Sequence, residues 1–292
     1  MTSSVNTQRM NSAVVTIQTP RNVLLNGILL GPSKPNTVIV WVHGLGSSLF
    51  SKRAIAELLV DETTAVLLFN NRGHDVVARV GHVTREKGLM AGAAHEVFTD
   101  CVDDIEGAVN FARKMGVKRV YIAGHSTGCQ KSIYWAAKKR RGVKGIILLA
   151  PVSDWAAETY LKGKKKLVRV EKVARSYVAQ GQRHRLLPPE VWPDILDAQR
   201  FLSLCTPTSV EEIFTYAQPG KNPRILGSIK IPVLVLWAQK DEFADRPAKE
   251  IAHWFDTNIR ALHSVIVIPK VGHSFKGGEK AVVTHIRRFI AA

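Results

Sequence analysis

The stretch RVYIAGHSTGCQKSIYWAAKK, residues 119 to 139, passes from a short apolar run to a helical run through the five residues GHSTG. Its opening is typical of a buried strand, and the run from Ser126 onward has the length of a helix. A serine on so sharp a turn has a strained backbone, and its flanking residues must be small so that strand and helix can approach closely. Gly124 and Gly128 meet that requirement. The stretch therefore predicts an exposed Ser126 at the end of a strand, as a nucleophile requires.

Apolar runs alternate with amphipathic runs along the chain, which is typical of β-α-β units and a mainly parallel sheet. Two runs at the start predict an antiparallel hairpin, and six more have the length of buried strands. The sequence therefore predicts an α/β fold with an eight-stranded sheet flanked by helices. The predicted strands are residues 13 to 19, 23 to 31, 37 to 42, 65 to 70, 119 to 124, 145 to 150, 232 to 238 and 264 to 269.

One long segment, residues 153–230, separates two predicted strands by far more chain than a simple crossover needs. It contains helical runs at residues 155 to 180 and 190 to 204, with the break Pro188-Pro189 between them. We expect this segment to be a mostly helical cap subdomain. The remaining residues, 1–152 and 231–292, then form the core domain.

A serine hydroxyl is a weak nucleophile until a base removes its proton, so a catalytic Ser126 needs a histidine held by a carboxylate. Without such partners, Ser126 would more simply cap a helix. His273, in VGHSF, follows the last predicted strand, and Asp241, in WAQKDEF, follows the strand before it. Glu242 and Asp245 compete with Asp241, which could instead cap the next helix. The predicted triad is Ser126, Asp241 and His273.

Acyl transfer also needs donors for the oxyanion of the intermediate, and HGLG, residues 43 to 46, follows a predicted strand. The backbone N–H groups of Leu45 and Thr127 are the predicted donors. An ordinary turn between strand and helix is the alternative. A phosphate-binding loop is excluded, because HGLG lacks the third glycine and the GK[ST] of such loops.

Four motifs together resemble the α/β-hydrolase superfamily over nearly the full chain. They are HG after the run at 37 to 42, GxSxG after 119 to 124, an acid after 232 to 238 and GH after 264 to 269. The resemblance implies the α/β-hydrolase fold and makes residues 153–230 a lid that governs substrate choice. The text from NNRGH to GHSTGCQ is similar to a hydrolase family that includes fungal siderophore esterases.

The resemblance also implies residues that contact the substrate, namely His43 and Gly44 in HGLG and Arg72 in FNNRGHD, residues 69 to 75. The latter phrase is similar to the superfamily's D-x-R-G-x-G turn. Asn70 and Asp75 replace its first and last members, and we expect this departure to reshape the wall of the pocket.

The expected reaction is cleavage of a small carboxylic ester through an acyl-enzyme. The same triad would also serve amide, thioester, lactone or carbon–carbon bond hydrolysis, and the fold can hold ligands without catalysis. No metal or organic cofactor is expected. In particular, HEVFT, residues 95 to 99, lacks the second histidine of a zinc HExxH helix.

The formal net charge is +17, and residues 162 to 185 hold nine Lys or Arg against the single Glu171. Such a surface attracts anions, so an anionic ester is one possible substrate, and a solvated helix face is the plainer interpretation. The sequence contains no RNA-binding or zinc-finger pattern, and we expect no specific nucleic-acid partner.

Three cysteines without CxxC spacing, Cys101, Cys129 and Cys205, predict buried thiols in a reducing compartment. The opening MTSSVNTQRMNSAVV lacks the apolar core of a secretory signal. No run approaches the ~18 apolar residues of a membrane span. We therefore expect a cytoplasmic protein.

Overall fold

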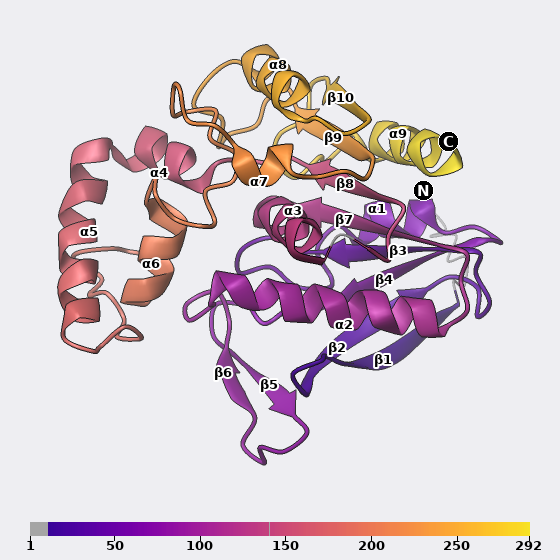
Figure 1. Cartoon of the computed structure of the whole chain (residues 1–292), viewed down its shortest axis with the longest axis horizontal. Helices are drawn as coiled ribbons and strands as arrows, with labels where there is room; N and C mark the ends of the chain where they lie inside the picture. Colours follow the sequence, from indigo (N-terminus) through magenta and orange to yellow (C-terminus); the bar gives the residue numbers. More distant parts are fainter. Residues whose placement is uncertain (1–10, 140) are drawn as a thin grey trace, which may run out of the picture.

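The computed structural model describes residues 11–139 and 141–292, and its strands form one sheet with helices on both faces (Figure 1). Within these residues the strand order is β10-β9-β8-β7-β3-β4-β2-β5-β6, with β1 paired to β2. Pairing from β4 through β3, β7, β8 and β9 to β10 is parallel, whereas β2 is antiparallel to its neighbours. The strands are β1 (Ser12–Gln18), β2 (Val23–Leu30), β3 (Thr37–Val42), β4 (Thr64–Phe69), β5 (Ala78–His82), β6 (Leu89–Ala91), β7 (Arg119–His125), β8 (Gly145–Leu149), β9 (Val233–Ala238) and β10 (His263–Ile268).

Each of the eight predicted runs overlaps one of these strands to within one residue at each end, which confirms the α/β class and the mainly parallel sheet. The sheet is wider than predicted because the short hairpin of β5 and β6 extends its edge. That hairpin joins the sheet through only two residue pairs, Val23 with His82 and Leu24 with Gly81. Its strands are too short and polar to show a period of two, so tertiary pairing rather than local pattern forms them.

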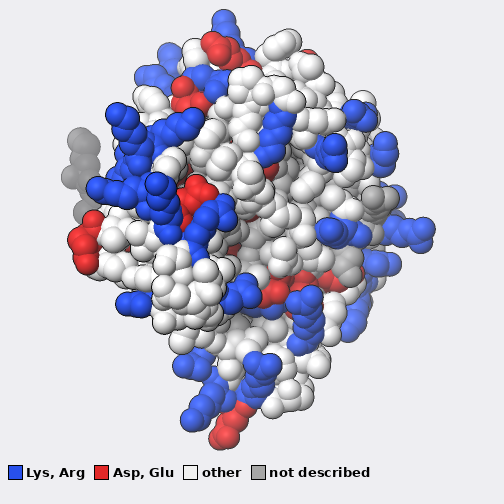
Figure 2. All heavy atoms as spheres, turned by 60° about the vertical axis from the view of Figure 1, so that its left-hand side comes forward, with Lys and Arg blue, Asp and Glu red and all other residues white. Residues whose placement is uncertain are grey.

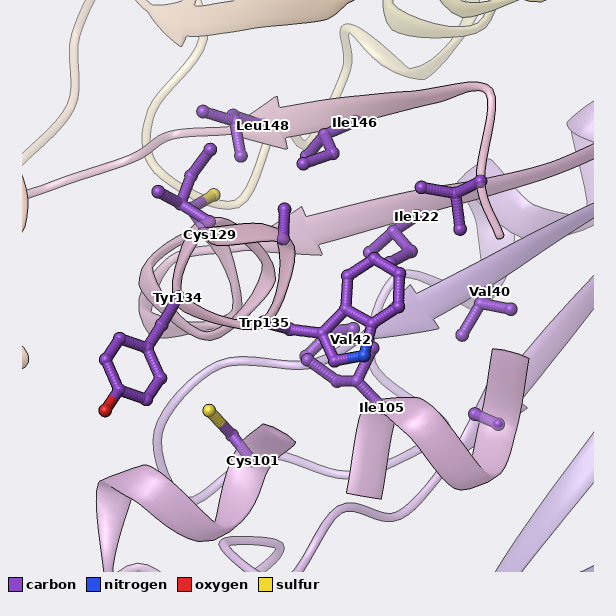
Figure 3. Close-up of a cluster of buried hydrophobic side chains, with 14 of the residues drawn as sticks. Val40, Val42, Cys101, Ile105, Ile122, Cys129, Tyr134, Trp135, Ile146 and Leu148 are labelled. Atoms are coloured by element: carbon purple, nitrogen blue, oxygen red, sulfur yellow. The ribbon is translucent and has the colours of Figure 1, made fainter. Parts of the chain in front are cut away.

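The central strand β3 is buried on both faces, and its side chains divide between two apolar clusters. Val38, Val40 and Val42 face one cluster, and Ile39 and Trp41 face the other. This alternation follows from the two-residue period of a strand, and burial on both faces explains why the run is apolar throughout. Around Val40 and Val42, Figure 3 shows Ile105, Ile122, Tyr134, Trp135 and Ile146.

Helices on the two faces of the sheet complete these clusters. The first cluster takes residues from α2 (Cys101–Lys114), α3 (Thr127–Lys139) and α8 (Ala248–Asn258). The second takes residues from α1 (Arg53–Leu59) and α9 (Glu279–Ala291). A short helix, η1 (Phe98–Asp100), precedes α2, and α7 (Arg224–Gly227) leads into β9.

Three helices of the predicted cap lie beyond the carboxyl ends of β3 and β7, toward which the arrows point in Figure 1. They are α4 (Asp154–Lys162), α5 (Lys164–Ala179) and α6 (Ala198–Cys205), and Gly163, with φ at +85°, divides the first predicted helical run into two. Buried side chains of α5 and α6 form a separate cluster with Trp192, whereas Ala156 of α4 belongs to the core cluster. Residues 213 to 229 instead join the cluster of the core. The division of the chain at residues 153–230 stays a prediction.

A buried chain of ion pairs connects the cap to the core. Lys131 Nζ on α3 lies 2.5 Å from Glu96 Oε1, and Arg200 Nη2 on α6 lies 3.0 Å from Glu96 Oε2. Arg200 also pairs with Glu211, and the side chains of Lys131 and Arg200 are fully buried. Each ion has a partner, as burial of charge requires. The cap is therefore fixed to the core by specific contacts on this side.

The thiols of Cys101, Cys129 and Cys205 are free and buried, in agreement with their predicted role as small apolar fillers. Across the part of the chain that the structure describes, no helix combines the length and apolar character needed to cross a bilayer. The predicted absence of a secretory signal falls largely on residues 1–10, which lie outside the described residues. The cytoplasmic location stays a prediction.

Candidate active site

Ser126 lies on the turn between β7 and α3, with φ at +55°. This left-handed backbone costs energy for a residue with a side chain, and the Ser126 N–H donates to the Leu149 carbonyl at 3.0 Å. A Cβ atom on Gly128 would overlap the carbonyl of Val42, and one on Gly124 would overlap Gly128 itself. The two flanking glycines are therefore needed for the close approach of strand and helix.

Three carboxylates in the loop after β9 each contact a different group. Asp241 Oδ2 lies 2.8 Å from His273 Nδ1, and the side chain of Asp241 is fully buried. Glu242 accepts a hydrogen bond from the His273 backbone N–H at 2.9 Å, and Asp245 pairs with Arg246 at 2.7 Å. Of the three candidate carboxylates, Asp241 is the one that orients the imidazole ring of His273.

Two aromatic rings and a carbonyl contact fix the position of His273. The rings of Phe243 and His125 lie 4.7 Å and 4.9 Å from the His273 ring. His125 Nε2 donates to the His273 carbonyl oxygen at 2.9 Å, and burial lowers the pKa of His125 well below its usual range. His125 is therefore a neutral packing partner rather than a second base.

Ser126 and His273 line one pocket of about 310 Å³ at the carboxyl edge of the sheet, between core and cap. A pocket of this size suits a small organic ligand. Its wall combines residues of the core with residues of α4 and α6. The lining residues are Gly44, Leu45, Ser47, Lys52, His125, Ser126, Val152, Asp154, Ala157, Glu158, Leu204, Phe243 and His273.

The loop after β3 brings the predicted oxyanion donors to the serine. A Cβ atom on Gly44 would lie 3.5 Å from Ser126 Oγ, so only glycine leaves this space to a substrate. Within residues 11–139 and 141–292, the Leu45 N–H donates no hydrogen bond to the protein. Thr127 is the first residue of α3, where N–H groups have no partner inside the helix. Two backbone donors thus stand free beside Ser126.

Two of the three predicted substrate contacts lie elsewhere. His43 is fully buried, and burial together with Lys131 lowers its pKa to about 3. Its Nε2 accepts a hydrogen bond from the Asn71 N–H, which ties the loops after β3 and β4 together. Arg72 forms ion pairs with Asp103 at 2.5 Å and Asp104 at 2.6 Å. Of the predicted contacts, the structure brings Gly44 alone to the pocket.

The cap contributes acidic side chains to the pocket. Asp154 and Glu158 lie one turn apart on α4, and both line the cavity with Ser126. Burial and the nearby Glu211 raise the pKa of Asp154 well above its usual range. Lys52 is the single cation of the lining, and burial lowers its pKa. The wall that α4 supplies is therefore acidic rather than basic.

The basic residues of the cap lie on other surfaces. Lys164 and Lys165 are exposed on α5, and neither lines the pocket. Lys162 pairs with Glu158 and Asp194, and its Nζ lies 4.0 Å from the Trp192 ring centroid. Figure 2, which brings the cap side forward, shows Lys and Arg gathered over this face. The positive charge of the cap is thus a feature of its outer surface.

Lys52, Phe243 and Asp154 are site residues that the sequence pattern did not single out. His125 and Phe243 are adjacent to predicted motifs, so their proximity could have been inferred. Lys52 and Asp154 carry no such signal, because their approach depends on how α1 and α4 sit over the sheet. A larger cavity of about 690 Å³ lies between the amino ends of the strands and α9, at the opposite edge from Ser126.

A mainly parallel sheet with helices on both faces, a serine on a glycine-flanked strand-to-helix turn and a helical cap define the α/β-hydrolase fold. By sequence, residues 92–290 match the family described as "Protein of unknown function (DUF1749)". The match spans more than half of the chain, and the chain belongs to this family. Among curated proteins, none matches the chain by sequence.

Solved structures share this fold at low sequence identity. A siderophore hydrolase, EstB from Aspergillus fumigatus, has a TM-score of 0.70 at 17% identity, covering 98% of this chain and 98% of its own. Est1E from Butyrivibrio proteoclasticus, solved with ferulic acid, has a TM-score of 0.62 at 19% identity, covering 95% and 98%. A thermophilic esterase from Thermogutta terrifontis has a TM-score of 0.56 at 22% identity, covering 96% and 98%. At these identities the likeness establishes the α/β-hydrolase fold.

Proposed function

We propose that this protein is a serine hydrolase that cleaves small carboxylic esters through an acyl-enzyme. The observation that carries the proposal is the 2.8 Å contact between Asp241 and His273, with His273 and Ser126 facing one pocket. A serine with a base and an orienting carboxylate is the arrangement that acyl transfer requires. The structurally similar esterases and hydrolases support this class of reaction.

In the first half of the reaction, Ser126 Oγ attacks the ester carbonyl carbon while its proton passes to His273 Nε2. Asp241 accepts the Nδ1–H bond and so holds the ring in the tautomer whose Nε2 is a base. The carbonyl oxygen becomes an oxyanion that the N–H groups of Leu45 and Thr127 bind, and each such donor contributes about 3 kcal/mol. The intermediate then collapses, and the alcohol leaves with the proton from His273.

In the second half, water replaces the alcohol. His273 takes a proton from the water as its oxygen attacks the acyl carbon, and the oxyanion returns to the same donors. Collapse returns the proton to Ser126 Oγ and releases the carboxylic acid. The protein supplies every group in this cycle from its own side chains and backbone.

In this proposal the cap, residues 153–230, determines which esters can enter the pocket. Its contribution to the pocket is two acidic residues, Asp154 and Glu158, with apolar Ala157 and Leu204. The carboxylate of Glu158 repels a carboxylate on the substrate, whereas burial raises the pKa of Asp154 and so favours its uncharged form. A neutral ester therefore suits the pocket better than the anionic ester that the net charge suggested.

Labelling with a fluorophosphonate probe tests the proposal. The probe should modify wild-type protein at Ser126, as peptide mass spectrometry would locate, and prior labelling should abolish hydrolysis of p-nitrophenyl acetate. A series of p-nitrophenyl esters from acetate to laurate then measures the acyl length that the pocket accepts. Absence of both labelling and turnover in folded protein would favour a ligand-binding role on this fold instead.

A further inference from the structure

A second cluster of side chains lies outside the pocket, where the cap meets the core. His95 belongs to the core segment between β6 and η1, His184 follows α5, and Asp197 precedes α6. His95 Nδ1 lies 3.0 Å and His184 Nδ1 2.8 Å from the same oxygen, Asp197 Oδ2. One donor atom from each residue lies within 4.8 Å of the others. Three separate segments therefore bring two imidazoles and one carboxylate to a single point.

The carboxylate of this cluster is buried without a permanent countercharge. The side chain of Asp197 is fully buried, and its ionic partners within residues 11–139 and 141–292 are the two histidines alone. The guanidinium of nearby Arg200 forms its ion pairs with Glu96 and Glu211. A buried carboxylate needs compensation, which here comes either from a protonated imidazole or from a bound cation.

The structure also fixes the direction of the carboxylate. Asp197 Oδ1 accepts a hydrogen bond from the Arg200 N–H at 2.7 Å, and the Asp197 N–H donates to the Ala94 carbonyl at 2.8 Å. These contacts leave Oδ2 to the histidines. Hydrogen bonds that orient a ligand in this way are typical of metal sites.

The cluster is open to solvent on one side. His95 and His184 line a cavity of about 660 Å³, and the side chain of His184 is 51% exposed. A hydrated ion can therefore reach the cluster, and water can complete its coordination. Because water can reach the cluster, it differs from a fully buried hydrogen-bond network whose role is only structural.

From this geometry we propose that His95, His184 and Asp197 bind one divalent transition-metal ion, with Zn²⁺ as the best match. Zinc takes nitrogen and oxygen ligands at about 2.0–2.2 Å in tetrahedral geometry, often three from protein and one from water. Its donors then lie ~3.3 Å apart, so the two Nδ1 atoms need to move away from Oδ2 by a few tenths of an ångström. Imidazole with one carboxylate suits zinc better than the oxygen-seeking Mg²⁺ or Ca²⁺.

Binding needs no redox step. Each neutral ring ligates through Nδ1 after its proton moves through water to Nε2, and a protonated ring releases its extra proton to solvent. Because His95 belongs to the core while His184 and Asp197 belong to the cap, the ion joins the two parts. It stabilises the folded chain by mass action and takes no part in the chemistry at Ser126.

Calorimetric titration of ZnCl₂ into untagged, chelator-treated full-length protein tests the site, and Co²⁺ absorption reports its geometry. The variants are His184→Ala, its conservative partner His184→Gln, and His95→Gln. His253→Ala removes an exposed histidine of α8 and is the matched control. Circular dichroism of each variant establishes that it is folded, and since His184 is half-exposed, both changes there are tolerable to the fold.

The proposal expects one Zn²⁺ per chain for wild type and for His253→Ala, visible tetrahedral Co²⁺ bands, and a thermal midpoint that rises with Zn²⁺. Removing a ligand should weaken the affinity for Zn²⁺ by about 100-fold or more. Mutation of residues that only orient a metal ligand already lowers metal affinity by about 10–100-fold. Wild-type protein that binds no stoichiometric Zn²⁺ overturns the proposal. So do folded His184 and His95 variants that bind Zn²⁺ as tightly as wild type.

Discussion

His273 Nδ1 lies 2.8 Å from Asp241 Oδ2, although the two residues are 32 positions apart and follow different strands. The contact exists because β9 and β10 are parallel neighbours whose carboxyl ends share one edge of the sheet. Asp241 is held in turn by the Phe243 N–H, which donates to its other oxygen at 3.0 Å. The carboxylate therefore has one oxygen free to orient the imidazole.

Asp241→Asn should lower kcat for p-nitrophenyl acetate by about 10⁴, because the amide can donate to Nδ1 and so favour the wrong imidazole tautomer. Asp245→Asn is the matched control in the same loop, and it should change kcat little since Asp245 pairs with Arg246. Steady-state kinetics of both variants decides the assignment. If Asp245→Asn proved the more damaging change, the acid would lie four residues further along the loop.

Ser126→Ala should abolish ester hydrolysis, with a loss on the order of 10⁴ to 10⁶ in kcat, and should leave the circular dichroism spectrum unchanged. His273→Ala should match it, and the double variant should be no worse, because the two residues act as one unit. Ser264→Ala, which changes an exposed serine at the opposite edge of the sheet, is the control. Turnover near the wild-type rate in Ser126→Ala would falsify the proposed nucleophile.

The parts of this site that the sequence predicts all lie at strand ends. Gly44, Ser126, Asp241 and His273 each follow a β-branched run, and parallel strands bring their carboxyl ends together whatever the loops do. Arg72 also follows a strand, but a position in sequence does not give the direction of a side chain, and three nearby aspartates draw it away from the pocket.

The acidic wall of the pocket was beyond prediction for a different reason. Asp154 and Glu158 have the spacing of one helix face, but the local sequence does not determine which face of α4 points toward the sheet. That orientation depends on buried contacts between distant segments, such as those of Ser153, at the start of α4, with Glu212 and Tyr216. The hairpin of β5 and β6 likewise forms through tertiary pairing, because five and three residues are too few to show a period.

Glu96→Gln should lower the free energy of unfolding by roughly 3–5 kcal/mol, because it leaves the buried cation Lys131 without a countercharge and removes one of the two carboxylate partners of Arg200. Adding Lys131→Met should recover part of that loss. Chemical denaturation measures each value. The exposed pair Arg53 and Glu57, at 2.5 Å, is the control, and Arg53→Met should cost under about 1 kcal/mol. Equal losses at the two sites would contradict the account of the buried chain.

Stability should depend on pH through Glu212, whose burial raises its pKa to about 7 from 4.5. The folded protein then binds a proton that the unfolded chain releases, so this contribution is full below pH 4.5 and is lost as pH rises through 7. Glu212→Gln stays neutral, so its stability relative to wild type should rise by about 3 kcal/mol between pH 4.5 and 7 and then level off. Denaturation curves at a series of pH values measure this difference. Parallel profiles for the two proteins would rule out the assigned titration.

The lysines in the first turn of α5 should have little influence on catalysis. Replacing Lys164, Lys165 and Lys166 together with Gln should leave kcat/KM within about twofold for both a neutral ester and its acidic analogue, because none of the three lines the pocket and surface charges are screened beyond roughly 10 Å at 0.1 M salt. Glu158→Gln should instead raise kcat/KM for the acidic ester relative to the neutral one, since it removes a carboxylate from the lining of the pocket that holds Ser126.

Ionic strength separates these two effects. Attraction by the surface lysines would make turnover of the acidic ester fall steeply with added salt, and the triple variant would lose that dependence. A wall that acts inside the pocket is screened less, so the preference between the two esters should persist at high salt. If the triple variant slowed the acidic ester alone, the basic surface of the cap would recruit the substrate after all. The acidic wall would then act only after the substrate has arrived.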